Sequence, residues 1–263
     1  MGHFFTLVRH EVRLLFIAPP TYVASVLFVL LMGFIYWAIL RSMTLMPQDT
    51  SSISQFFSLF WLPVFFTVPL LTMRSIAEEK NQATLQTLFS APIPKYAIVL
   101  SKFFAAYLLY LILWALTLYF PIITYNLLPD NLSNASLVDS SAILGSLLFI
   151  FLSGILFIAI GIFTSSLTRS QLVAGMLCFT FLFIICIGGQ QLEYATYNYF
   201  AQGSFFFESI QYVNVIRHFE DFSLGILDTR PFVFYLSISV LLLSLTVNSV
   251  SYTHLTLPTM YTV

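Results

Sequence analysis

The segment from Arg74 to Pro92 holds the densest group of residues that could do chemistry. It opens with a charged run, Glu78-Glu79-Lys80, and continues with Leu85, Leu88 and Phe89. These last three residues have helical i, i+3, i+4 spacing, which predicts an apolar ridge on one side of a short helix. Such a ridge beside charges suits docking into a groove of another protein. A solvated loop whose apolar residues lie on a bilayer surface would show the same pattern, so both interpretations stay open from the residues alone.

Two other groups of residues could in principle hold a metal or a redox centre. His218 lies two positions before Glu220, but no second histidine stands at ligand spacing, so we expect no metal or proton site there. Cys178 and Cys186 are eight residues apart, about 12 Å along a helix, whereas a disulfide needs Cα atoms within about 7 Å. We therefore interpret both cysteines as buried apolar residues, and we expect no bound cofactor.

The composition determines the class of protein that must position these residues. Hydrophobic residues make up 59% of the chain and charged residues 8%, against roughly 25% charged residues in soluble domains. The formal net charge of −1 offers no broad basic face for nucleic acid. We predict an all-α polytopic membrane protein with about six transmembrane helices, at Thr21–Leu40, Phe56–Met73, Phe103–Tyr125, Ser141–Leu167, Leu172–Gly189 and Pro231–Val247.

The predicted spans have two further features. Pro63 and Pro69 interrupt the second span and predict kinks. None of the six spans contains Asp, Glu, Lys, Arg or His. Ion-coupled transporters need such residues within the membrane, so this absence disfavours a secondary transporter.

The positive charges predict the orientation. Only three of the ten lie in the remaining loops (Arg41, Arg217, Arg230), while the amino terminus and the loops after spans two and four hold Arg9, Arg13, Arg74, Lys80, Lys95, Lys102 and Arg169. The positive-inside rule then places the amino terminus in the cytoplasm, and six spans return the carboxyl end to the same side.

The amino-terminal residues predict an amphipathic helix at the membrane surface. From His3 to Phe16, a cationic face that includes Arg9 and Arg13 lies opposite an apolar face. Glu11 falls within the apolar arc and needs a partner. One hypothesis pairs it with a cation such as Arg74. The alternative is a slight rotation that lets the carboxylate reach solvent.

Two segments in the second half of the chain depart from the pattern of apolar spans. Between spans five and six, residues 190–230 mix tyrosines and phenylalanines with acidic residues, which favours helices at the outer interface. After about Val247 the chain has no Lys or Arg, and the last predicted helix is short, at about seventeen residues against the 20 of a full span. This favours a tail, residues 248–263, that is not native.

Several motifs, in order, resemble those of type-2 ABC transporter permeases. They are Arg74, Glu78-Glu79-Lys80, Thr84-Leu85, Leu88, Ala91-Pro92, Ile98-Val99-Leu100 and Lys102-Phe103. Two other segments look like the gliding-motility subgroup of that family: Glu11 with Pro19-Pro20-Thr21-Tyr22-Val23, and Arg217 to Phe222 with Gly225-Ile226 and Asp228.

The resemblance implies half of an exporter in a bacterial inner membrane. Two such permeases, alike or paralogous, would face each other, each resting on a cytoplasmic ATP-binding subunit that holds the ATP and Mg. This chain has no phosphate-binding loop, so it is not expected to be the ATPase. The rival is a non-transporting membrane component of a gliding-motility or cell-envelope complex that docks the same ATPase.

The resemblance also implies a division of the chain. Residues 1–20 form the interfacial helix, with Arg9, Glu11 and Arg13, and residues 21–247 form the six-helix permease domain, with a re-entrant outer region at about 190–230. A coupling helix at about 75–92 would dock the ATPase through Glu78, Glu79, Lys80, Thr84, Leu85, Leu88, Phe89 and Pro92.

Overall fold

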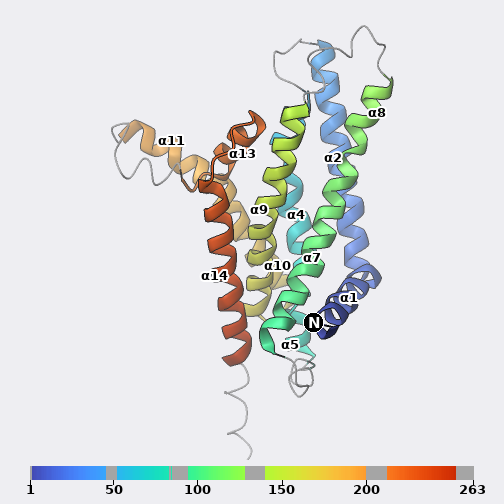
Figure 1. Cartoon of the computed structure of the whole chain (residues 1–263), viewed down its shortest axis with the longest axis vertical. Helices are drawn as coiled ribbons and strands as arrows, with labels where there is room; N and C mark the ends of the chain where they lie inside the picture. The colour runs from blue at the N-terminus through green and yellow to red at the C-terminus, as the bar shows by residue number, and fades with distance from the viewer. Residues whose placement is uncertain are drawn as a thin grey trace, which may run out of the picture.

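The computed structural model describes residues 2–45, 52–82, 84, 94–127, 140–199 and 212–252, and every regular element within these ranges is helical (Figure 1). The elements are α1 (Gly2–Ile17), α2 (Pro19–Leu45), α3 (Ser52–Ser58), α4 (Trp61–Thr72), α5 (Ala77–Asn81), α7 (Lys95–Thr117), α8 (Tyr119–Leu127), α9 (Ser140–Leu167), α10 (Gln171–Phe183), the π-helical turn η1 (Ile184–Gly188), α11 (Gly189–Tyr199), α13 (Val215–Ser223) and α14 (Arg230–Tyr252).

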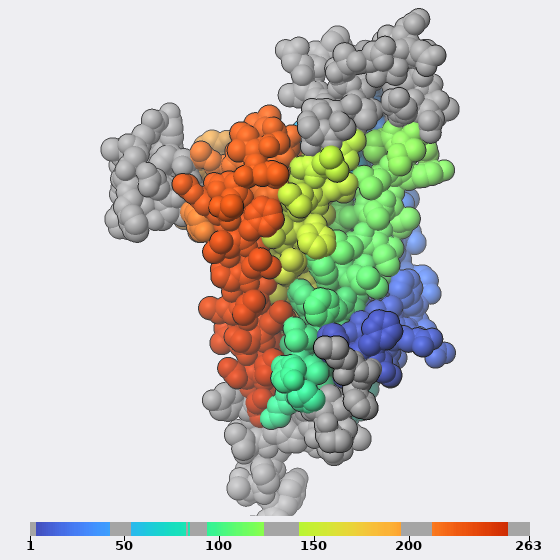
Figure 2. Space-filling view, viewed as in Figure 1, coloured from blue at the N-terminus to red at the C-terminus, as the bar shows by residue number. Residues whose placement is uncertain are grey.

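Helix α9 is the centre of the bundle. It packs against α14, α10, α13, α7 and α4, and Figure 2 shows it as a strip between α14 and α7. Glycines permit this close packing: a Cβ at Gly161 would lie 2.2 Å from Thr72 Oγ1 of α4, and one at Gly154 would lie 2.4 Å from the Tyr110 ring of α7. Small residues at such crossings let helices that share a membrane approach each other closely.

Among the described residues, five helical stretches are long and apolar enough to cross a membrane: Pro19–Ser42, Lys95–Ile123, Ala142–Leu167, Gln171–Ala195 and Arg230–Ser251. The remaining predicted span is the second, residues 56–73, and it is divided between α3 and α4. The break lies at Leu59 and Phe60, just before Pro63, which has no N–H to donate to the Leu59 carbonyl. That carbonyl instead accepts from Leu62 N at 3.1 Å. The helix is therefore broken just before Pro63, where a kink is predicted, whereas Pro69 lies inside α4 without ending it.

Buried aromatic rings surround this break. Phe60 is fully buried, and its ring centroid lies 5.0 Å from that of Phe149 in α9 and 5.4 Å from that of Phe219 in α13. Aromatic pairs at such distances stabilise a core beyond the area they bury. The broken second span is therefore fixed against both the central helix and the outer region.

Two predicted boundaries are wrong. The third spanning helix begins at Lys95 rather than Phe103, because Pro94, in an extended conformation, precedes its first turn. Lys102 therefore lies inside this span. The expectation that the spans hold no ionisable residue is wrong, because the membrane-crossing stretches also include Arg41, Lys95, Glu193 and Arg230. The last helix, α14, continues to Tyr252 and is 23 residues long, rather than ending near Val247.

The outer region, between α10 and α14, changes direction twice. The π-helical turn η1 follows α10, and α11 then leaves the bundle sideways (Figure 1). Asn214 precedes α13 as its N-cap, and its side-chain oxygen accepts from Ile216 N at 3.0 Å. After the helix ends, Gly225 (φ +77°) turns the chain, and Ile226 N donates to the Asp221 carbonyl at 2.9 Å. This left-handed cap, a Schellman motif, explains the glycine of the Gly225-Ile226 motif.

Candidate functional site

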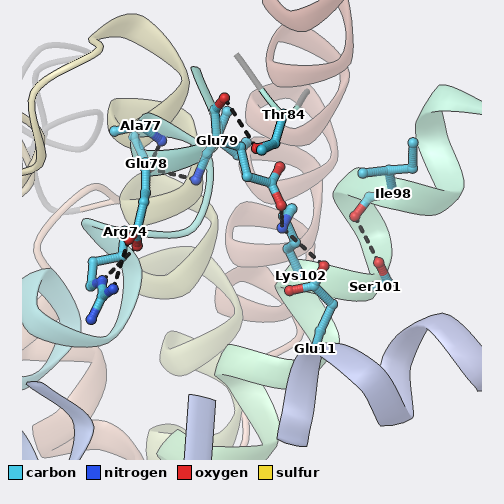
Figure 3. Close-up of polar contacts among 11 residues, drawn as sticks. Glu11, Arg74, Ala77, Glu78, Glu79, Thr84, Ile98, Ser101 and Lys102 are labelled. Atoms are coloured by element: carbon cyan, nitrogen blue, oxygen red, sulfur yellow. Dashed lines mark hydrogen bonds and ion pairs between the residues drawn. The ribbon is translucent and has the colours of Figure 1, made fainter. Parts of the chain in front are cut away.

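Lys102 lies between two carboxylates that come from different helices. Its ammonium donates to Glu79 Oε1 of α5 at 2.6 Å and to Glu11 Oε1 of α1 at 2.9 Å (Figure 3). The lysine side chain is only 4% exposed, and those of Glu11 and Glu79 are 17% and 24% exposed. A buried ammonium is stable only when it is paired and hydrogen-bonded. These three residues, the Lys102 triad, therefore join α1, α5 and α7 at one end of the bundle.

The sequence places two members of the triad, Lys102 and Glu11, by local causes. Lys102 is two turns into α7, on the face that also carries buried Val99 and Ala106. Glu11 lies on the inward side of α1, which packs along α7 with the Phe4 ring 6.1 Å from that of Phe104.

Burial sets the electrostatics of the triad and its neighbours. Burial raises the pKa of Glu79 above its ordinary value, and the Lys102 charge only partly opposes this effect. Glu79 Oε2 is enclosed and has no hydrogen-bond partner among the residues that the structure describes. Arg74 and Glu78 form a separate fork, with Nε to Oε2 at 2.6 Å and the second guanidinium nitrogen to Oε1 at 2.7 Å. This hydrogen-bonded arginine lowers the pKa of Glu78.

A second set of contacts fastens α5 to the end of α9. Ser165 Oγ of α9 accepts from Ile76 N at 3.0 Å and from Ala77 N at 3.1 Å, and donates to the Met73 carbonyl at 3.2 Å. Helix α5 has no side-chain cap of its own at Ile76, so Ser165 supplies the cap from another helix. In return, the Lys80 ammonium donates to the Ser166 carbonyl. A cation at the carboxyl end of a helix is favourable. We call these contacts the α5–α9 clasp.

The clasp also reaches α14, because Ser249 Oγ donates to the same Ser166 carbonyl at 3.2 Å. The five-residue helix α5 is thus tied by polar contacts, directly or through one residue, to α1, α7, α9 and α14. Such a short helix has little stability by itself, so these contacts determine where it lies.

The structure distinguishes between the two alternatives for Glu11. The carboxylate points into the protein and pairs with a cation, as one of the two hypotheses states, but its partner is Lys102. The predicted partner, Arg74, binds Glu78 instead. Arg9 and Arg13 lie on the exposed side of α1.

The predicted docking residues are divided. Glu78, Glu79 and Lys80 lie together on α5 and Thr84 is exposed, whereas Leu85, Leu88, Phe89 and Pro92 lie outside the described residues. Sequence reasoning missed Lys102 and Ser165. For Lys102 a signal was present, since its triad partner Glu11 was recognised as needing a cation.

A comparison with known families identifies the chain. The sequence profile of a family described as "ABC-2 family transporter protein" matches residues 38–247, well over half of the chain. The chain belongs to the ABC-2 transporter family. It is a multi-pass membrane protein, the permease component of an ABC transporter. The ATPase activity of the transporter resides in a partner ATP-binding subunit. A comparison with curated proteins finds no match.

The permease offers little for metal or redox chemistry within its described part. No group of three or more His, Cys, Asp or Glu there could hold a metal ion, and Cys178 and Cys186 are free and buried. His218 is 6% exposed, its Nδ1 lies 3.2 Å from Tyr235 Oη, and burial lowers its pKa. This histidine is therefore interpreted as a neutral core residue of the outer region.

Proposed function

We propose that this permease transmits ATP-driven motion of its partner into its own helix bundle through α5. The observation that carries the proposal is the attachment of α5 by the Lys102 triad and the α5–α9 clasp. A displacement of a segment held in this way would move α1, α7 and α9 together. Apolar contacts alone would let the helices slide past one another, whereas paired charges and caps have defined partners.

Packing supports this transmission immediately above the clasp. Thr72, the last residue of α4, meets α9 at Gly161, and its hydroxyl donates to the Val68 carbonyl of its own helix at 2.8 Å. The chain then passes through Met73, whose carbonyl the clasp engages, into α5. A shift of α5 is therefore expected to reach the α4–α9 crossing without a flexible segment in between.

The contacts favour a division of labour within the coupling segment, residues 75–92. Glu79 and Lys80 have partners inside the permease, so in this proposal they anchor the segment along with Glu78. Thr84, Leu85, Leu88, Phe89 and Pro92 remain as the residues that dock the ATP-binding subunit. An apolar ridge on a short helix suits a groove of a partner protein.

The proposal includes the wider assembly and its location. Two permeases, alike or paralogous, would form the exporter in a bacterial inner membrane, with α1 in the interface and the amino terminus in the cytoplasm. Arg9 and Arg13 on the exposed side of α1 support this orientation. The resemblance to the gliding-motility subgroup keeps one alternative, a non-transporting component that docks the same ATPase. ATP-dependent movement of a defined cargo in vesicles would separate the two.

Co-purification with the partner ATP-binding subunit tests the docking. Leu85→Asp puts a charge on the apolar ridge, and Glu79→Lys places a second cation against Lys102, so both variants should lose most of the bound ATPase. Glu220→Lys, an exposed charge reversal on α13, should retain it. Undiminished binding of the ATPase in both Leu85→Asp and Glu79→Lys would overturn the coupling-helix assignment.

A further inference from the structure

A cavity of about 470 Å³ lies beside the Lys102 triad, where α1, the start of α2, the end of α4 and α5 meet. Its lining has two unlike parts. One part is apolar and includes Leu14, Ile17 and Leu70. The other part carries charge and contains both the triad and the Arg74–Glu78 fork. A cavity that combines such surfaces fits an amphipathic ligand better than a small soluble one.

The charges select among amphipathic ligands. The lining holds three carboxylates and two cations, so among the described residues it has an excess of one negative charge. The Lys102 ammonium is buried and already engaged by two carboxylates. Arg74 is the more accessible cation, with a side chain 31% exposed against 4% for Lys102. Its neighbour Glu78 is 24% exposed, as is Glu79, whose Oε1 is already bound to Lys102. A ligand would therefore meet one cation and one anion side by side.

The apolar part indicates where the ligand comes from. Leu14 and Ile17, at the end of α1, are 48% and 64% exposed although they line this cavity. Both lie where the amphipathic helix α1 turns into the spanning helix α2, which is the level of lipid headgroups if α1 lies in the interface. Acyl chains beside Leu14 and Ile17 would place a lipid headgroup next to Arg74 and Glu78.

We propose that this cavity binds an aminophospholipid, with the lipid phosphate on Arg74 and the lipid ammonium on Glu78. Phosphate and guanidinium form strong charge-assisted hydrogen bonds, and so do ammonium and carboxylate. A primary ammonium has three N–H donors, whereas the trimethylated ammonium of phosphatidylcholine has none. Phosphatidylglycerol has no cation for Glu78, and its net negative charge meets an excess of negative charge in the lining. Bound in this way, the lipid would brace α1 against α5, the segment proposed above to couple to the ATPase. The binding itself does not depend on that coupling role.

Native mass spectrometry of the full chain in detergent tests the proposal. The protein is offered equal amounts of phosphatidylethanolamine, phosphatidylcholine and phosphatidylglycerol with identical acyl chains. We expect phosphatidylethanolamine to be retained about tenfold over phosphatidylcholine, the factor of one charge-assisted hydrogen bond. Soluble phosphoethanolamine at the same concentration should not displace it, because the apolar contacts would be missing. Equal retention of the three lipids, preference for phosphatidylglycerol, or displacement by the soluble headgroup would overturn the proposal.

Two variants of different kinds assign the binding to this cavity. Glu78→Gln keeps an acceptor for Arg74 but removes the charge, so the preference for phosphatidylethanolamine over phosphatidylcholine should disappear. Ala18→Phe fills the cavity, since Ala18 lines it, and should reduce retention of both lipids. The matched control is Asp228→Asn, which removes a carboxylate far along the chain in the outer region and should leave the preference at its wild-type value. An unchanged preference in Glu78→Gln would contradict the assignment.

Discussion

Replacing Lys102 by methionine tests the buried triad at its centre. The substitution keeps an unbranched side chain of similar length but removes the ammonium and both of its ion pairs. Glu79 would then keep its buried position without Lys102, the one cation among the described residues that stabilises its charge. The loss should therefore be much larger than for an exposed ion pair.

The expected loss follows from the burial of the three side chains. Removing one partner of a buried ion pair costs about 3–5 kcal/mol. Glu11 and Glu79 are still 17% and 24% exposed, so water recovers part of this energy. We expect the free energy of unfolding to fall by about 2–3 kcal/mol at pH 8. Titration of the purified permease in mixed micelles with sodium dodecyl sulfate, followed by circular dichroism, measures this value.

The loss should depend on pH in a defined direction. Burial already raises the pKa of Glu79, and removal of Lys102 raises that pKa further. The folded variant then holds a proton that the unfolded chain has released, so its stability increases as pH falls toward the ordinary pKa. We expect the difference from wild type to be smaller at pH 5 than at pH 8 by about 1 kcal/mol.

The matched control is Arg230→Met. The Arg230 side chain is 75% exposed, and its Nε lies 3.6 Å from Asp228 Oδ2. Its replacement should therefore lower the free energy of unfolding by less than about 0.5 kcal/mol. If Lys102→Met cost no more than this control, the triad would not hold the helices together. An equal cost at pH 5 and pH 8 would refute the role of Glu79 within it.

Three further predictions concern packing, pairing and capping. Gly161→Ala should lower the free energy of unfolding by about 1–3 kcal/mol, because its Cβ would lie 2.2 Å from the stiff side chain of Thr72. The control Gly175→Ala, with its nearest contact at 3.6 Å, should not lower it. Equal unfolding free energies of the two variants would contradict the close crossing. Glu11→Gln should lower the free energy of unfolding less than Lys102→Met does, since Lys102 keeps its other carboxylate, Glu79. An equal loss in the same micelle titration would contradict stabilisation by the Lys102–Glu79 pair. Asn214→Ala removes the cap of α13 and should cost about 1 kcal/mol, seen as faster amide exchange in α13 alone; unchanged exchange there would show that the cap is not needed.

The sequence predicts the helical class because this depends on local pattern, and it leaves the side chain of Glu11 either pointing inward to a partner or rotated toward solvent. Hydropathy alone identifies the spans, and the helical wheel places Glu11 in the apolar arc. The partner of Glu11 is a different matter, because Lys102 is 91 residues away. No local rule distinguishes it from Arg74, which is satisfied by Glu78 four positions ahead.

The missed residues have a common physical cause. A lysine beside an apolar run is ordinarily the end of a span, so Lys102 is interpreted as a boundary although α7 begins at Lys95. Serine hydroxyls in apolar helices usually bond to their own backbone, as Ser166 does to the Phe163 carbonyl. Ser165 instead bonds across to the residues that precede α5. Only the packing of α9 against α4 and α5 reveals that difference.

The central claim, that α5 couples the ATPase to the bundle through the clasp, is tested most directly by Ser165→Ala in the reconstituted complex. This variant removes the acceptor for Ile76 N and Ala77 N without touching the apolar ridge. The control is Ser244→Ala, which removes an exposed hydroxyl bonded to its own helix at Leu241. We expect Ser165→Ala to bind the ATPase as wild type does but to lose several-fold in permease-dependent ATP hydrolysis, while Ser244→Ala keeps both. Full hydrolysis in Ser165→Ala, with the ATPase bound, would contradict transmission through the clasp.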